Sequence, residues 1–501
     1  MAEVVATVDI GTTAAKAALI TPEGHILRRG QVTYPLYTGP HGEVEQKPED
    51  WWNATCQALH ACEPQQFHVL ALIFSGQMQD LIAIGQNRAL RPAILYSDQR
   101  ASIEFDLVLQ TVGVERWHRL TGNLQDASSL PAKMLWLKRR EPDVYRDTEV
   151  ILLGAHDYIT WRACGARVTD LTTASTTGLL NLRTNRFLTE LLRELGLRTD
   201  WLPELSLAEE VVGRLSPEAA EAMGLPAGIP VFHGAGDAAT TTVGVGAGEP
   251  GRSYLYLGTS GWLAASEDGR MADPLTGIFT LRHPNSAWTI LIGPMMTAGG
   301  NLEWMRRQQM KEIPYDTLSD LAASSAPGSH GVIYLPYLAG ERCPFRDSHV
   351  RAAFIGLSTY TSWADMVRAV LEGVAFGFRS IAEAIWPEYK ATPIQELFIA
   401  GGGSRSSLWC QIISDVLNCT VHRTAAPEDV AARGAFILAG KGLGWYESYV
   451  PSPEMFPIEA TFEPRLDVVA TYARYYAIFR DLYPVLRDVF SRIRAARPER
   501  G

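Results

Sequence analysis

The sequence lacks the features that mark secreted, zinc-finger and membrane-spanning proteins. Its 501 residues include six cysteines, widely spaced and without a Cys-x-x-Cys pair, which excludes a disulfide framework and a cysteine zinc site. No apolar run approaches the roughly 20 residues of a transmembrane helix. No basic and apolar signal segment precedes the strand-like residues 4–8. We therefore expect a soluble, cytoplasmic protein with no membrane partner.

Basic residues are also too few for a nucleic-acid-binding surface. The net charge is −10, whereas binding to a nucleic acid backbone needs a basic footprint. The chain has no Gly-x-x-x-x-Gly-Lys-Ser/Thr loop. Any phosphate group must therefore be held by backbone amides and a metal ion.

The chain does contain an internal repeat. Residues 3–20 predict a hairpin of two strands around Gly11-Thr12-Thr13, and residues 253–263 repeat that pattern around Gly258-Thr259-Ser260. Predicted helices beginning at Pro48 and covering 363–384 and 467–490 alternate with strands, which indicates an α/β protein. In a chain of this length, one such strand–turn–strand unit in each half predicts two similar domains that face each other.

The most glycine-rich stretch lies between the two copies. Residues 244–251 read Gly-Val-Gly-Ala-Gly-Glu-Pro-Gly, a composition typical of a hinge or a domain boundary. As a dinucleotide motif the stretch is weak, because Glu-Pro-Gly favours a turn over the start of a helix. We place the boundary between residues 1–247 and residues 248–501.

Two aspartates are the candidates for chemistry. Asp9 ends a strand beside the Gly-Thr-Thr turn, where it could hold a hydrated Mg²⁺ while turn amides and hydroxyls bind phosphate; a plain hairpin turn is the alternative. Asp237 follows a buried strand and a glycine turn at a predicted helix start. The helix dipole there would favour its ionised form and a role as a general base. Its alternative is a simple N-cap.

Two glycine segments and two polar segments could bind ligands. Residues 401–403 are three glycines followed by a serine cap and a helix, a backbone on which a flat ligand can lie. Residues 297–301 resemble them more weakly and could equally serve close packing. Residues 75–80 and 97–100 place donors and acceptors after strands, which suits a polyhydroxylated ligand, although each could be only a turn.

Taken together and in order, these segments resemble the FGGY family of carbohydrate kinases, most closely its xylulokinase branch. The resemblance covers nearly the whole chain. It rests on residues 9–13, 48–52, 76–78, 91–95, 236–237, 257–261, 335–342 and 401–403, with a further pattern at 354–357, 365–366 and 369–372.

The resemblance implies two actin-like, RNase H-like domains with ATP and a sugar in the cleft between them. Residues 1–247 would bind the sugar and residues 248–501 the nucleotide, with Mg²⁺ as the metal. Asp237 would be the catalytic base, and Asp9 would lie near the metal. The expected sugar-binding residues are Gln77, Met78, Gln79, Asp98, Arg100 and Asp237, and the expected nucleotide-binding residues are Thr12, Thr13, Thr259, Gly299, Gly402 and Gly403.

Two departures from the family pattern bear on the substrate. Xylulokinases usually carry His where this chain has Gln79, and Asn where it has Ala238. A lost polar contact costs about 1 to 3 kcal/mol toward a substrate that needs it. D-xylulose, phosphorylated to D-xylulose 5-phosphate, is therefore the leading candidate, with ribulose, gluconate, glycerol or another ketose or polyol as alternatives.

Two further readings come from other functional classes. The same fold serves ATP-driven conformational switches such as actin and chaperones, but the extra length here lies in segments such as 76–98, which line a small-molecule cleft in the resembled family. A sugar and ATP sensor without catalysis is compatible with Ala238, whereas the presence of Asp9 and Asp237 argues against it. The 13 tryptophans would permit a homodimer surface without locating one.

Overall fold

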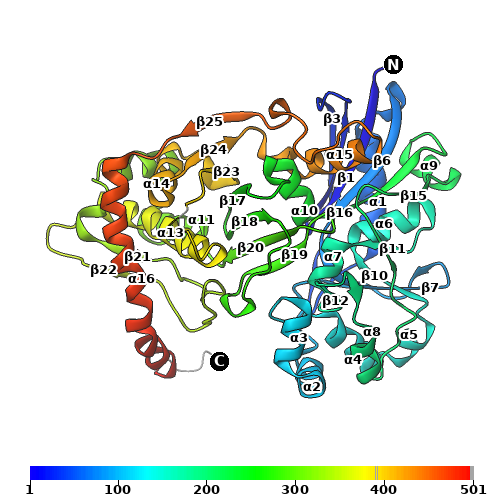
Figure 1. Ribbon diagram of the computed structural model, residues 1–501, viewed down its shortest axis with the longest axis horizontal. Coiled ribbons are helices and arrows are strands. Elements are labelled where there is room, and N and C mark those ends of the chain that lie inside the picture. Colours follow the sequence, from blue (N-terminus) through cyan, green and yellow to red (C-terminus); the bar gives the residue numbers. More distant parts are fainter. Residues whose placement is uncertain (390, 392, 497–501) are drawn as a thin grey trace.

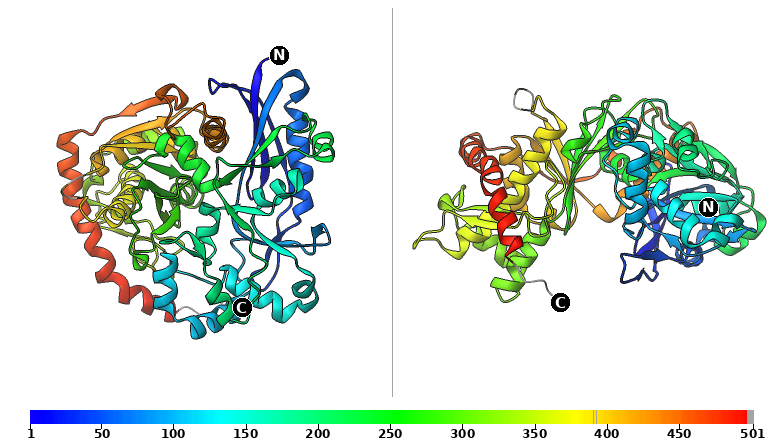
Figure 2. Two further views of the ribbon diagram at one scale, coloured as in Figure 1. Left: turned by 45° about the vertical axis from the view of Figure 1, so that its right-hand side comes forward. Right: turned by 90° about the horizontal axis from the view of Figure 1, so that it is seen from below.

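The computed structural model describes residues 1–389, 391 and 393–496. The chain forms two lobes that lie side by side, each built around its own twisted sheet (Figure 1). Figure 2 shows the lobes from two further directions, with the N-terminal strands in one lobe and the long C-terminal helix on the outside of the other.

The N-terminal lobe contains a six-stranded sheet. Its central strands run parallel, while both outer pairs are antiparallel. In spatial order the strands are β3 (Ile26–Thr33), β2 (Ala14–Ile20), β1 (Glu3–Ile10), β6 (His68–Gly76), β16 (Pro230–Gly236) and β15 (Val211–Arg214). The parallel strands β1, β6 and β16 therefore end at the same edge.

The C-terminal lobe repeats this arrangement, which confirms the predicted duplication. Its strands follow the same order, with one more strand, β19 (Phe279–Arg282), added beyond β20. The equivalent strands are β20 (Thr289–Met295), β18 (Gly261–Glu267), β17 (Ser253–Leu257), β23 (Glu396–Ala400), β24 (Thr420–Thr424) and β25 (Ile458–Phe462). Here β17, β23 and β24 are the parallel strands.

Shorter strands complete the lobes. A second, antiparallel sheet of the N-terminal lobe holds β4 (Tyr37–Thr38), β5 (Val44–Gln46), β7 (Met78–Gly85), β8 (Arg88–Ala89), β9 (Ala93–Ile94) and β10 (Val150–Gly154). Three two-stranded pairs are β11 (Val168–Asp170) with β14 (Glu204–Ser206), β12 (Leu180–Asn181) with β13 (Arg186–Phe187), and β21 (Ile333–Leu335) with β22 (Ala353–Ile355).

Helices cover both sheets. In the first half they are α1 (Pro48–Ala61), α2 (Ser102–Val112), α3 (Val114–Thr121), α4 (Leu130–Arg140), α5 (Pro142–Asp147), α6 (Ala155–Cys164), α7 (Leu171–Thr176), α8 (Thr189–Glu194), α9 (Pro217–Met223) and α10 (Asp237–Thr242). In the second half they are α11 (Gly299–Gln309), α12 (Tyr315–Ala323), α13 (Trp363–Ile385), α14 (Ser407–Leu417), α15 (Val430–Gly442) and α16 (Leu466–Ala495). The predicted helices at 48, 363–384 and 467–490 are confirmed as α1, α13 and α16.

Helix α15 crosses between the lobes. It follows β24 of the second sheet but packs against β1 and β6 of the first (Figure 1). Its Phe436 belongs to an apolar cluster that includes Val5 and Phe232 of the N-terminal lobe and Tyr254 and Phe398 of the C-terminal lobe. The two lobes are therefore joined through a shared core, while each sheet has a core of its own.

The first part of the glycine-rich stretch, residues 244–248, is buried, whereas Gly251 at its end is exposed. Residues 243–247 continue α10 as buried helical turns, and only Gly246 leaves the helical conformation. A Cβ atom on Gly244 would lie 1.8 Å from the carbonyl oxygen of Val430 on α15. These glycines let α10 and α15 approach closely, a contact between segments that the sequence does not reveal. No described helix has the length and apolarity needed to cross a membrane.

The close contact of Gly244 with α15 predicts that a methyl group added at Gly244 destabilises the fold. Gly244→Ala should lower the thermal unfolding midpoint by several degrees, because a backbone clash of this size costs on the order of 1 to 3 kcal/mol. The matched control is Gly402→Ala, where a Cβ atom would meet nothing within 4 Å. Equal unfolding midpoints for both variants and the wild type, measured by calorimetry, would contradict this account of the interlobe packing.

Candidate active site

A cavity of about 330 Å³ opens between the two lobes beside Asp237. Both halves of the chain line it. The N-terminal half contributes Gln77, Met78, Gln79, Tyr96, Thr176, Asp237, Ala238 and Thr241, and the C-terminal half contributes Tyr254, Trp262 and Ile292. Apolar and aromatic walls with a few polar groups are typical of a site for a small organic ligand.

The sheet register brings the two candidate aspartates to the same edge. Asp9 on β1 and Ala235 on β16 each lie opposite Ser75 of the intervening strand β6. The Ser75 hydroxyl donates to Asp9 Oδ1 at 3.0 Å and lies 2.7 Å from the hydroxyl of Thr240, on the helix that begins with Asp237. One serine therefore connects both carboxylate-bearing segments.

The pKa of Asp237 is raised to about 7. Burial is the main cause and the negative charge of Asp9 the second, whereas the charge of His156 acts in the opposite direction. Burial also raises the pKa of Asp9. We expected the dipole at the start of α10 to favour ionised Asp237; in the structure burial and like charge outweigh it. A carboxyl group that titrates near neutral pH can accept a proton and release it again.

The capping alternative for Asp237 is not supported. Asp237 is the first residue of α10, and the N-cap position belongs to Gly236, which provides no side-chain hydrogen bond. A Cβ atom at Gly236 would lie 2.1 Å from Met78 Sδ. Glycine at this position thus lets Met78 lie against the strand end, and the Asp237 side chain remains available to the cavity.

Gln77, Met78 and Gln79 line the cavity, as expected for the sugar-binding segment. Gln79 has a left-handed backbone with φ +66°, which is strained for a residue with a side chain. The buried ammonium group of Lys133 stabilises it by donating to the Gln79 carbonyl oxygen at 2.9 Å. Gln79 Nε2 donates to the Ser128 hydroxyl at 2.9 Å, which fixes the side chain and leaves its amide oxygen to accept a bond.

Asp98 and Arg100, by contrast, do not line this cavity. Asp98 is fully buried and accepts bonds from Val44 N at 2.6 Å and from the Arg100 guanidinium at 2.7 Å. Arg100 also pairs with Glu45 at 2.7 Å and lies over the ring of Trp136. These bonds fix the segment that follows β9. Because neither Asp98 nor Arg100 lines the cavity, the cavity gives no support to a sugar-binding role for them.

The three glycines at 401–403 have three different surroundings. Gly401 has φ +98°, and its Cβ atom would meet the backbone of Leu257; a Cβ atom on Gly403 would lie 2.5 Å from the Leu257 side chain. Only Gly402 faces open space. The expected serine cap is also displaced, because α14 is capped by the Ser406 hydroxyl after a short 3-10 turn. Of the three, Gly402 remains the best candidate for contact with a ligand.

Gly299 is explained largely by packing. Its amide donates to the carbonyl oxygen of Gly258 at 2.8 Å, and its Cβ atom would lie 2.6 Å from that oxygen. The start of helix α11 thus packs against the Gly258-Thr259 turn; the alternative considered for this segment was close packing, there expected between two helices. In the two turns Thr13 and Thr259 are exposed and Thr12 is half-buried; within the described residues, the amides of all three donate to no backbone acceptor.

Sequence reasoning missed the aromatic wall of the cavity. Trp262 stacks on Tyr256, the counterpart of Asp9 in the second repeat, with ring centroids 4.1 Å apart. Its indole N–H donates to the Tyr254 hydroxyl at 3.1 Å. The sequence signal was present in the unusual Tyr-Leu-Gly-Thr-Ser-Gly-Trp order, but only the antiparallel pairing of β17 and β18 brings Tyr256 opposite Trp262.

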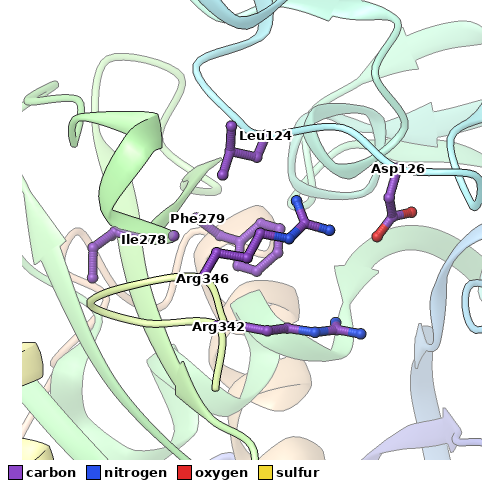
Figure 3. A pocket seen from close by; sticks show the side chains of 7 residues that line it. Leu124, Asp126, Ile278, Phe279, Arg342 and Arg346 are labelled. Atoms are coloured by element: carbon purple, nitrogen blue, oxygen red, sulfur yellow. The ribbon is translucent and has the colours of Figure 1, made fainter. Parts of the chain in front are cut away.

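A second, smaller cavity of about 20 Å³ contains the motif residue Arg342. Figure 3 shows the Arg342 and Arg346 side chains extending toward the side on which Asp126 lies. Asp126 comes from the N-terminal lobe and the two arginines from the C-terminal lobe. Arg342 therefore lies at the boundary between the lobes and does not line the cavity that holds Asp237.

Family models match both halves of this architecture. The N-terminal domain of the FGGY family of carbohydrate kinases matches residues 4–244, and the C-terminal domain of that family matches residues 256–443. The chain belongs to the FGGY family of carbohydrate kinases. It is a xylulokinase-like carbohydrate kinase, and its two actin-like domains agree with the fold expected from the sequence.

Individual relatives match over nearly their full length. The chain is 29% identical to the xylulose kinase of Bacillus subtilis over 98% of each chain. It is also 29% identical to a gluconokinase of the same organism, over 97% of this chain and 96% of that one. The crystal structure of a ligand-bound xylulose kinase from Lactobacillus acidophilus has a TM-score of 0.90 at 26% identity, covering 98% and 100% of the two chains.

The raised pKa predicts the pH dependence of activity. For wild-type enzyme, kcat/KM for the sugar should rise with pH through about 7 as Asp237 ionises. Asp237→Asn should lower kcat by roughly 10²- to 10⁴-fold, the usual contribution of a general base. A coupled assay between pH 5 and 9 measures both quantities. A wild-type profile that is flat over this range, or a variant within a few-fold of wild type, would rule out the assigned role.

The raised pKa of Asp237 also predicts that the folded protein becomes less stable as the pH rises, although its activity increases. With its pKa raised, folded Asp237 retains its proton between about pH 4 and pH 7 where the unfolded chain releases it, so stability falls as pH rises through this window. Asp237→Asn lacks that penalty and should be more stable than wild type at pH 8 by about 1 to 3 kcal/mol. The difference should vanish below pH 4. Denaturant unfolding at both pH values checks this, and Asp237→Asn less stable than wild type at pH 8 would contradict it.

Proposed function

We propose that the enzyme transfers the γ-phosphoryl group of ATP to a hydroxyl of a small sugar, most directly a ketopentose such as D-xylulose, giving D-xylulose 5-phosphate and ADP. The observation that carries this proposal is the cavity between the lobes, in which Asp237, with a pKa near neutral, lies beside the polar segment 77–79. The names of the relatives support the choice of xylulose.

We further propose that residues 1–247 bind the sugar and residues 248–501 bind the nucleotide. The N-terminal lobe supplies Gln77, Gln79 and Asp237 to the cavity. The C-terminal lobe supplies the open backbone at Gly402 and the turn at Thr259. Thr12 lies beside the cavity, since its hydroxyl is 3.3 Å from that of Tyr96, which lines it, and Thr13 is the next residue of the same turn.

In this mechanism Asp237 accepts the proton of the reacting hydroxyl as its oxygen bonds to the γ-phosphorus and the bond to ADP breaks. The amides of Thr12, Thr13 and Thr259 donate to phosphate oxygens. Asp9 fits a metal site, because its Oδ1 is oriented by Ser75 at a strand end; bound Mg²⁺ would neutralise phosphate charge. Apposition of the lobes excludes water, which would otherwise compete with the sugar for the phosphoryl group.

Gluconate is the second candidate substrate. A gluconokinase matches this chain as closely in identity as a xylulose kinase does. Gln79 and Ala238, both in the cavity lining, stand where xylulokinases usually carry His and Asn. Coupled ADP release across ketopentoses, ketohexoses, pentitols, gluconate and glycerol decides between them. D-xylulose should give the largest stimulation of ADP release. If gluconate gave the largest, it would replace D-xylulose as the proposed substrate, and no stimulation by any sugar would contradict the proposed kinase reaction.

The homodimer considered from the sequence stays a prediction, which sedimentation velocity would test.

If one lobe binds the sugar and the other binds ATP, substitutions in the two lobes should affect the kinetic constants of different substrates. Gln79→Ala should lower kcat/KM for the sugar by roughly 10- to 200-fold through a lost hydrogen bond, with KM for ATP unchanged. Gly402→Val should raise KM for ATP, with sugar binding unchanged, because its side chain fills the open space over that backbone. The exposed residue Gln66 provides a matched control, Gln66→Ala. The reverse pattern, with Gln79→Ala acting on ATP alone, would overturn the assignment of the lobes.

A further inference from the structure

Four buried side chains that the phosphoryl-transfer mechanism does not use lie together next to Asp237. His156 and Asp157 begin α6, Asp170 ends β11, and His233 lies on β16, the strand that leads to Asp237. Each is at most 1% exposed. One ligand atom from each, an imidazole nitrogen or a carboxylate oxygen, can be chosen so that all four lie within 4.8 Å of one another.

Backbone amides orient both carboxylates. Asp157 Oδ2 accepts the amides of Leu153 and Gly154 at 2.9 and 3.1 Å. Asp170 Oδ1 accepts the amides of Thr172 and Thr173 at 2.8 and 3.0 Å. Each aspartate thus has one oxygen fixed by the start of a helix, and its other oxygen faces the imidazoles. Such outer hydrogen bonds are the usual way in which proteins orient the carboxylate ligands of a metal.

Hydrogen bonding within the cluster leaves several atoms unsatisfied. His156 Nε2 lies 3.0 Å from Asp170 Oδ2 and 3.1 Å from Asp157 Oδ1, and His233 Nε2 lies 3.2 Å from Asp157 Oδ1. Only the contact between His156 and Asp170 has hydrogen-bond geometry. Within the described residues, Asp157 Oδ1 and both ring nitrogens of His233 have no hydrogen-bond partner. Burying such groups without a partner is costly.

One divalent metal ion would bond to Asp157 Oδ1 and to one ring nitrogen of His233, two of the atoms that have no hydrogen-bond partner within the described residues. Two imidazole nitrogens and two carboxylate oxygens are a ligand set that zinc accepts, and one divalent charge balances the two carboxylates. Metal–ligand bonds of about 2.0 to 2.2 Å at tetrahedral angles place the ligand atoms roughly 3.3 to 3.5 Å apart. The three separations given above, 3.0 to 3.2 Å, are close to that spacing. Mg²⁺, which favours oxygen ligands and water, suits this set poorly.

We propose that His156, Asp157, Asp170 and His233 bind one divalent transition-metal ion, zinc by the donor set, in a closed structural site. Four protein ligands leave no open position for a substrate, so the ion would have no direct part in phosphoryl transfer. It would link α6, β11 and β16 and fix the position of β16, the strand that leads to Asp237. This site is separate from the Mg²⁺ proposed at Asp9 and does not depend on the proposed function.

The experiment begins with the full-length enzyme, purified without a histidine tag from cells grown with added zinc. Metal analysis by mass spectrometry should find about one zinc per chain after gel filtration. Enzyme produced with Co²⁺ in place of zinc should show the strong visible absorption of a tetrahedral site. His233→Gln should lose both signals, whereas the exposed residue His25 provides a matched control, His25→Gln, that keeps them.

Stability gives a second readout on the wild-type enzyme alone. Prolonged treatment with a zinc chelator should lower the thermal unfolding midpoint by about 5 °C or more, and added zinc should restore it. Folded wild-type enzyme with less than about 0.1 metal per chain and no change on chelation would overturn the proposal. The cluster would then be a hydrogen-bonded ion network. Kinase activity with Mg²⁺ is assayed in parallel, so that failure of this proposal is distinguished from failure of the proposed function.

Discussion

Asp9 lies near the end of β1 and Asp237 directly follows β16, on either side of β6 in one sheet. Burial, together with the negative charge of Asp9, holds the pKa of Asp237 near neutrality. Parallel pairing of β1, β6 and β16 makes this proximity unavoidable. The negative charge of Asp9 makes ionisation of Asp237 more costly, and a proton or a bound metal ion would reduce that cost. The serine hydroxyl between the two segments keeps them in register.

The fold also depends on contacts between the two lobes. Helix α15 of the second half covers the first sheet, and glycines at the end of α10 allow the contact. The cavity draws its polar groups mainly from one lobe and its aromatic wall from the other. Substrate choice would therefore depend on residues such as Gln79 and Ala238, while the orientation of the lobes decides whether bound sugar meets the nucleotide.

Much of this could be predicted from the sequence. The repeated strand–turn–strand device, the helix at 363–384 and the positions of Asp9 and Asp237 follow from local patterns of β-branched, glycine and acidic residues. Residues 77–79 line the cavity, and their sugar-binding role stays a prediction. What could not be predicted depends on contacts between distant segments: the Trp262–Tyr256 stack, the packing of Gly244 on α15, and the ion pair that removes Asp98 and Arg100 from the cavity lining. The pKa of Asp237 likewise needed the burial that only the assembled lobes provide.

The most direct test of the central claim is a carboxyl titration by ¹³C NMR on enzyme labelled at aspartate. The account predicts one resonance that titrates near pH 7, is absent in Asp237→Asn, and moves to a lower pKa in Asp9→Asn because the neighbouring negative charge is gone. If no aspartate titrates above about pH 5, or if the Asp9 substitution leaves the pKa of Asp237 unchanged, the coupling of the two carboxylates is contradicted.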